Sequence, residues 1–187
     1  MASTLKINNL DTASGTTITI PTGKTLVGTD SGSVKAPGTV IQVVHNKVPH
    51  TGGATTTSAS LVDSGLFVEI TPKYSNSKIL VTYHQHFYNY GGGADSGAAF
   101  VLQRRTSPSG SFTELEAGVE SAGTSATYMA GDGNSELAGR YSDTFLDTPN
   151  STSLCKYNIR MSVHSGGSVS TSLSNTNSVM TAMEIAQ

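Results

Sequence analysis

One stretch of the sequence decides the fold class: Leu154-Cys155-Lys156-Tyr157-Asn158-Ile159-Arg160-Met161-Ser162-Val163. From Cys155 to Val163 an apolar or aromatic side chain occupies every second position, and Lys, Asn, Arg and Ser fill the positions between them. Successive side chains of a β-strand point to opposite faces of its sheet, so this alternation is typical of a strand with one buried face. It predicts an antiparallel sheet with a core on one side.

Seven further segments have strand character, and turns rich in Gly and Ser separate them. They are Thr39 to His45, Leu66 to Thr71, Lys78 to Tyr90, Ala98 to Arg105, Gly139 to Asp147, Ser168 to Leu173 and Ser178 to Ile185. Eight short strands over about 150 residues are typical of two antiparallel sheets packed face to face. The sequence therefore predicts an all-β chain whose main part is a jelly-roll-like β-sandwich, and it predicts no helix.

The composition supports this fold class and excludes several functions. Hydrophobic residues make up 36% of the 187 residues, charged residues 13%, and Ser and Thr together number 51. Thr favours strands, whereas Gly and Ser favour turns. The formal net charge of −2 gives no electrostatic reason to bind nucleic acid. The single cysteine, Cys155, excludes an intrachain disulfide and a zinc site of several thiolates.

The sequence also predicts where the protein is made. Its first residues include no apolar run of signal-peptide length, and no run of apolar residues is long enough for a membrane-spanning helix. We therefore expect synthesis in the cytoplasm and no membrane insertion.

The N-terminal part differs from the rest because its apolar residues are few. They are spaced as in short strands, and the candidates for attachment or trimerisation are Leu5, Ile7, Leu10, Ile18, Ile20 and Leu26. A Gly- and Ser-rich break follows and ends at Gly38. We expect residues 1–37 to form an extended β arm and linker, and residues 38–187 to form the sandwich. Two or three short strands cannot stabilise themselves in water, so the arm needs a partner unless it is a disordered tail.

The sequence offers one candidate metal site, at His84 and His86. Two residues apart on a strand, both imidazoles would point to the same face. Cupin metalloenzymes carry a similar His-x-His pair followed by a Glu ligand, but here Asn89 to Gly91 stand in its place. Three chains meeting on an axis would supply six imidazoles for one ion; otherwise the pair is a partly exposed strand face. We expect no cofactor.

Other catalytic patterns are weak. Glu114 with Glu116, and Asp143 with Asp147, could form carboxylate pairs of the kind that glycoside hydrolases use, but such spacings are common by chance. No nucleophile elbow and no phosphate-binding or dinucleotide-binding loop is present. The sequence therefore predicts that the protein is not an enzyme.

A candidate recognition site lies where aromatic residues run into glycines. Tyr88 and Tyr90 precede Gly91, Gly92 and Gly93. If the rings end a strand beside a loop, they can stack on a sugar face; otherwise they close one end of the core.

Several motifs resemble those of virion structural proteins of marine tailed bacteriophages. They are Met1-Ala2-Ser3-Thr4-Leu5-Lys6-Ile7-Asn8-Asn9, Thr17-Ile18-Thr19-Ile20-Pro21, Pro37-Gly38-Thr39-Val40-Ile41-Gln42, and, within the run Val62 to Tyr83, Ile70-Thr71-Pro72 and Ser77-Lys78-Ile79-Leu80-Val81. The resemblance covers the chain from Met1 to about Tyr90. It implies a short attachment segment followed by an exposed β domain, often trimeric, and it transfers no site residues.

Together these observations predict a non-enzymatic phage virion protein. We expect a short homotrimeric fibre or tail-associated protein whose arm binds another virion protein and whose sandwich faces the medium, with a host-surface glycan as a further partner. A capsid decoration or head-fibre protein is the alternative, and a cupin-like metal-dependent enzyme is the third.

Overall fold

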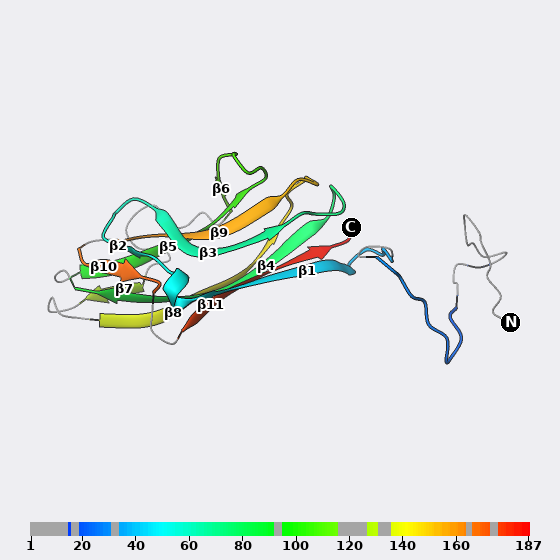
Figure 1. Cartoon of the computed structure of the whole chain (residues 1–187), viewed down its shortest axis with the longest axis horizontal. Coiled ribbons are helices and arrows are strands. Elements are labelled where there is room, and N and C mark those ends of the chain that lie inside the picture. Colours follow the sequence, from blue (N-terminus) through cyan, green and yellow to red (C-terminus); the bar gives the residue numbers. More distant parts are fainter. Residues whose placement is uncertain are drawn as a thin grey trace.

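The computed structural model describes residues 15, 19–30, 34–91, 95–115, 127–130, 136–163, 166–172 and 176–187, with the backbone alone for 95–96 and 127–130. Two antiparallel sheets pack face to face as a sandwich, and Figure 1 shows them as two layers. The all-β sandwich expected from the sequence is therefore confirmed.

The larger sheet has the strand order β1-β11-β4-β10-β2, and β8 pairs with the other edge of β4. Its strands are β1 (Val40–Pro49), β2 (Thr55–Thr56), β4 (Lys78–Tyr90), β8 (Glu136–Asp147), β10 (Ser168–Ser170) and β11 (Asn177–Ile185). The smaller sheet has the order β3-β9-β5-β6, with β7 also paired to β5. Its strands are β3 (Val62–Ile70), β5 (Asp95–Arg105), β6 (Thr113–Glu114), β7 (Thr127–Ala130) and β9 (Cys155–Val163).

All eight predicted strands are present, with shifted ends. β1 continues to Pro49, and β3 begins at Val62 rather than Leu66. The short strands β2, β6 and β7 and the single 3-10 turn η1 (His50–Gly52) were not predicted. Elements of two to four residues are too short to produce a readable hydrophobic period.

The core lies between the sheets, and one face of β9 points into it as expected. The expectation that the other face is open is wrong, because Asn158 and Ser162 on that face are buried as well. Cys155, Tyr157, Ile159 and Met161 are fully buried. They pack with inward side chains of the neighbouring strands, which are Leu66, Val68, Ile70, Ile79, Val81, Tyr83, Phe87, Ala98, Phe100, Leu102, Val169, Met180 and Ala182. The burial of these side chains is the main source of stability for the sandwich.

A buried ion pair joins the two sheets. Arg104 of β5 donates from Nη1 to both carboxylate oxygens of Asp147 in β8, at 2.7 and 2.6 Å. Tyr157 of β9 donates its hydroxyl hydrogen to the same carboxylate at 2.8 Å. Burial, together with the carboxylate of Asp147, raises the pKa of Tyr157, so the phenol stays protonated. Breaking this contact would leave a charge in the core without its partner.

A second buried carboxylate organises the end of the sandwich where β1 begins. Glu184 of β11 accepts hydrogen bonds from the backbone amides of Lys73 and Tyr74 and from the side chain of Gln42. Burial acts to raise the pKa of Glu184, but these hydrogen bonds outweigh it and lower the pKa. Glu184 thus fixes the turn between β3 and β4 against the interior side of β11.

The arm has no strand in its described residues, 15, 19–30 and 34–37. The exposed fractions of Ile20 and Leu26 are 45% and 64%. Leu5, Ile7, Leu10 and Ile18 lie outside the described residues. The division into a 1–37 arm and a 38–187 domain stays a prediction.

We predict that Asp147→Asn lowers the free energy of unfolding by about 3 kcal/mol, because it leaves the guanidinium of Arg104, whose side chain is 16% exposed, without its counter-charge. The control is Glu69→Gln, which breaks a more exposed pair with Lys156 at 3.7 Å and should change stability by less than about 1 kcal/mol. Urea unfolding of both variants measures the difference. Equal effects would contradict the assignment of a structural role to the buried pair.

Candidate functional site

The candidate residues share the outer face of β4. Along this strand, buried and more accessible residues alternate over all 13 positions. Tyr83, Gln85 and Phe87 point into the core, whereas the positions between them face outward. The structure therefore places His84, His86, Tyr88 and Tyr90 on one face, as the two-residue spacing predicted.

Tyr88 and Tyr90 form an exposed aromatic pair. Their ring centroids are 5.5 Å apart, and the rings are inclined by 33°. The exposed fraction of Tyr90 is 44%, and neither ring belongs to the buried core. The interpretation that these rings close the end of the core is therefore wrong, because the strand's alternation turns them away from it.

The neighbouring strand supplies a polar partner for this pair. The side chain of Glu136, in β8 directly opposite Tyr90, forms a hydrogen bond with Tyr88. This hydrogen bond is the largest cause of a raised pKa at Tyr88. Two inclined rings beside a carboxylate provide apolar faces for stacking and an acceptor for hydroxyl groups.

Gly91 has a structural role at the end of β4. Its φ of +69° lies in the left-handed region, which favours glycine. Gly167, with φ +73°, approaches so closely that a Cβ at that position would overlap the carbonyl oxygen of Gly91. Gly92 and Gly93 lie outside the described residues.

The two histidines have different surroundings. The Nδ1 atom of His84 lies 2.9 Å from the hydroxyl oxygen of Ser142 in β8. Partial burial lowers the pKa of His86, and the nearby charges of Arg140 and His84 lower it further. Arg140 pairs directly with His86 across the strands, and both line a shallow hollow of about 180 Å³.

A metal site is not completed within the described part of one chain. That part contains no group of three or more His, Cys, Asp or Glu residues that could hold a metal ion. Asn89, which stands where cupins carry a Glu ligand, is fully buried. A shared ion on a trimer axis stays a prediction, and the guanidinium of Arg140 opposite His86 disfavours it.

The other candidate catalytic groups form contacts that stabilise the fold or are buried in it. Asp147 is held by the buried ion pair, and Glu114 accepts a hydrogen bond from Gln103 at 3.2 Å. Burial raises the pKa of the Cys155 thiol to about 11, with Arg104 and Asp147 acting in opposite directions. This thiol is therefore protonated at neutral pH, which makes it a poor nucleophile. Glu116 lies outside the described residues.

Sequence reasoning missed the residues that β8 contributes. Glu136, Arg140 and Ser142 reach the candidate face through the pairing of β8 with β4. Strand register depends on contacts between distant segments, so the sequence alone did not show which residues lie opposite each other. The alternation of Glu136, Ala138 and Arg140 with less exposed residues was the available signal.

Comparisons with known proteins give little further information. No protein-family model matches the chain, and no curated protein matches it. Among solved structures it is similar to the VP2 protein of infectious bursal disease virus, solved as a D431N mutant in derived T=1 particles. The identity is 10% and the TM-score is 0.32, and the match covers 87% of this chain but 41% of that one. A likeness at this level carries no conclusion about function.

Among the residues that the structure describes, no helix is both long enough and apolar enough to span a bilayer.

We predict that Tyr88→Ala and Tyr90→Ala each lower the free energy of unfolding by less than about 1 kcal/mol, because both rings lie on the outer face. Tyr83→Ala is the matched control on the same strand. That ring is fully buried, so its loss should cost about 3–5 kcal/mol. Thermal and urea unfolding test this contrast, and a large loss of stability in the Tyr88 or Tyr90 variant would contradict it.

Proposed function

We propose that this chain is a non-enzymatic structural protein of a bacteriophage particle. In this proposal it is a short homotrimeric fibre or tail-associated protein, attached through its N-terminal arm to another virion protein. The sandwich extends from the particle and binds a host-surface glycan. The resemblance of the first part of the sequence to marine phage virion proteins supports the virion assignment.

The observation that carries the proposal is the separation of the two candidate regions along β4. The arm enters β1 at Val40, which pairs with Ile185, and Ile185 pairs with Lys78 at the first position of β4. Tyr90 is the last residue of the same strand. A strand of 13 residues spans about 40 Å, so an arm bound to a particle leaves the tyrosine pair far from the attachment point.

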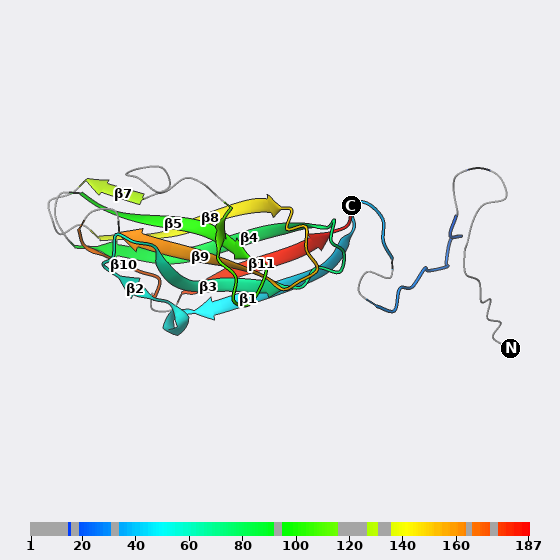
Figure 2. The same cartoon turned by 90° about the horizontal axis from the view of Figure 1, so that it is seen from above.

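The end with the tyrosines is also where several strands end or begin. Tyr90 lies opposite Glu136 at the start of β8 and opposite Ser168 at the start of β10. Figures 1 and 2 place this end of the sandwich opposite the arm. Connections between strands are the usual carriers of recognition in β-sandwiches, and the tyrosine pair adds apolar faces for a sugar ring.

The exposed apolar side chains of the arm support the attachment role. Ile20, Leu26 and Val27 are exposed in the isolated chain. Their burial against a partner would give a favourable free energy of roughly 1.5–3 kcal/mol for each fully buried side chain. The sandwich core uses none of these residues.

We predict that the full-length variant Ile20→Ser, Leu26→Ser, Val27→Ser folds normally but is absent from phage particles. Its sandwich should still unfold cooperatively, because the three side chains lie outside the core. Immunoblotting of purified particles measures incorporation, and Tyr90→Ala is the control that should be incorporated. Normal incorporation of the triple variant would refute the anchoring role of the arm.

Binding to the host should depend on the tyrosine pair. The double variant Tyr88→Ala, Tyr90→Ala should be incorporated into particles but reduce the affinity for host cells about tenfold or more, since loss of each stacked ring costs roughly 0.5–1.5 kcal/mol. Phe112→Ala, which removes an aromatic ring near Arg105 of the other sheet, is the control and should leave adsorption unchanged. Unchanged adsorption of the double variant would contradict the glycan-binding role and favour a decoration protein.

A further inference from the structure

The outer face of the larger sheet carries a row of apolar side chains. The pairing register places Val43 of β1 opposite Met183 of β11, Met183 opposite Leu80 of β4, and Leu80 opposite Leu146 of β8. Directly opposite residues of antiparallel strands share a face. These four residues, here called the apolar row, therefore lie side by side across four strands, over about 15 Å.

The ends of the apolar row are exposed in the isolated chain, and Leu80 and Met183 between them are half-buried. The exposed fractions of Val43 and Leu146, at its two ends, are 56% and 48%. Val40, beside it on the same face, is exposed as well and lies opposite Ile185. One adjacent row consists of His45, Thr181, Thr82 and Thr144, and the other contains Val40, Ile185 and Lys78, so Lys78 is the charged side chain that borders the apolar row on β4. Contiguous apolar surface of this kind marks an interaction site.

The remaining exposed apolar side chains are concentrated in the arm. Eight large hydrophobic side chains are exposed in the described part of the chain. Four of them belong to the arm, three lie in or beside the apolar row, and the eighth is Tyr90. The members of the arm are Ile20, Leu26, Val27 and Val34. Within the described residues, the arm and the apolar row therefore carry seven of the eight large exposed hydrophobic side chains, with Val40 counted beside the row.

Contacts at the start of the sandwich direct the arm away from its own apolar row. The amide of Gly38 donates to the carbonyl oxygen of Ala186 at 2.8 Å, and the ammonium group of Lys35 lies 4.1 Å from the ring centroid of Tyr74. Tyr74 belongs to the turn that Glu184 holds on the interior side of β11. Lys35 therefore lies at the end of the sandwich rather than over its outer face.

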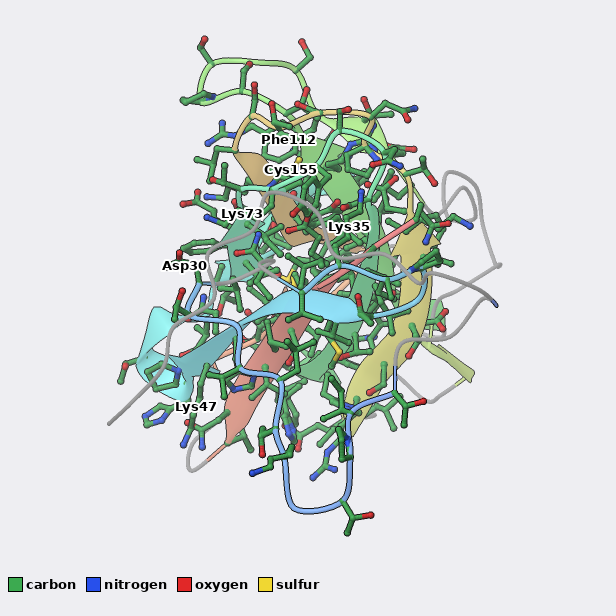
Figure 3. All side chains as sticks on the ribbon, turned by 90° about the vertical axis from the view of Figure 1, so that its right-hand side faces the viewer. Asp30, Lys35, Lys47, Lys73, Phe112 and Cys155 are labelled. Atoms are coloured by element: carbon green, nitrogen blue, oxygen red, sulfur yellow. The ribbon has the colours of Figure 1, made fainter. Side chains whose placement is uncertain are left out.

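The figures show the same direction of departure. In Figures 1 and 2 the described arm residues run outward beyond the C-terminus and away from both sheets. Figure 3 looks onto this end of the sandwich, with Cys155 of the smaller sheet and Phe112 of the loop before β6 in the upper part and Lys47 of the larger sheet in the lower part. An arm that leaves in this direction meets a neighbouring molecule more directly than the outer face of its own sheet.

We propose that the arm of one copy docks on the apolar row of a neighbouring copy. This inference rests on the homotrimer of the proposed function and deepens it, because it supplies the surface that the arm binds between copies. The chain makes 14 steps from Leu26 to Val40, so Leu26 can reach about 45 Å from the start of β1. An arm-to-row contact is head-to-tail, and such contacts close into rings when the rotation between copies permits. The expected trimer is one such ring.

Two full-length variants test this contact. The arm variant is Leu26→Ser with Val27→Ser, and the row variant is Val43→Lys with Leu146→Glu. The control is Pro49→Lys with Ala138→Glu, which makes the same changes on the outward, exposed positions of β1 and β8 outside the apolar row. Light scattering should give an oligomer for the original protein and the control, and monomers for both variants.

Mixing the two variants distinguishes arm exchange from other modes of association. A 1:1 mixture should form a complex of two chains, because the row variant donates an intact arm to the intact row of the arm variant. If the arm variant and the row variant both stay monomeric after mixing, the proposal is overturned. That result would instead indicate contacts of row with row and of arm with arm. An oligomer that survives the row substitutions would overturn it as well, while leaving the trimer of the proposed function intact. If the unsubstituted protein is a monomer, both the arm-to-row contact and the trimer of the proposed function are overturned.

Circular dichroism checks that each variant is folded. If the row variant fails to fold, Val43→Thr with Leu146→Thr replaces it, since Thr suits exposed strand positions. The same outcomes then apply to that variant.

Discussion

The two-residue period of β4 is the constraint on which the rest of the structure depends. This strand lies inside the larger sheet, pairs with β8 along one edge and with β11 and β10 along the other, and runs the length of the sandwich. Its inward side chains, Tyr83 and Phe87 among them, build the core. The same period sends Leu80, the histidines and the tyrosine pair to the outer face. If the register of β4 shifted by one residue, its core side chains and its candidate surface side chains would therefore exchange faces together.

This arrangement gives the molecule two different ends. Glu184 and the turn near Tyr74 fix the end where the arm departs, and Gly91 with Gly167 shapes the end that carries the tyrosine pair. Between these ends, the ion pair of Arg104 in β5 with Asp147 in β8 connects the two sheets. The proposed function assigns attachment to the first of these ends and recognition to the second. The apolar row lies on the outer face of the larger sheet, and in our proposal it binds the arm of a neighbouring copy.

Much of the fold could be predicted from the sequence, because alternation along a strand is a local signal. The period through Cys155 to Val163 and the length of β4 were both readable, and the structure confirms both strands. The sheet order and the register were not readable, since they depend on which distant strands pair. For this reason the partners of the candidate residues, Glu136 and Arg140, were missed. The apolar row was missed for the same reason: its four members lie on four strands and become neighbours only through pairing.

The most direct test of the central claim is a photo-cross-link from the arm. A photoreactive amino acid replaces Leu26 in full-length protein, and unlabelled and ¹⁵N-labelled copies are mixed before irradiation, so that mass spectrometry separates links within a chain from links between chains. The account predicts mixed-isotope cross-links between position 26 and peptides that contain Val43, Leu80, Leu146 or Met183. Cross-links from position 26 only to another arm, or only to the apolar row of the same chain, would contradict it.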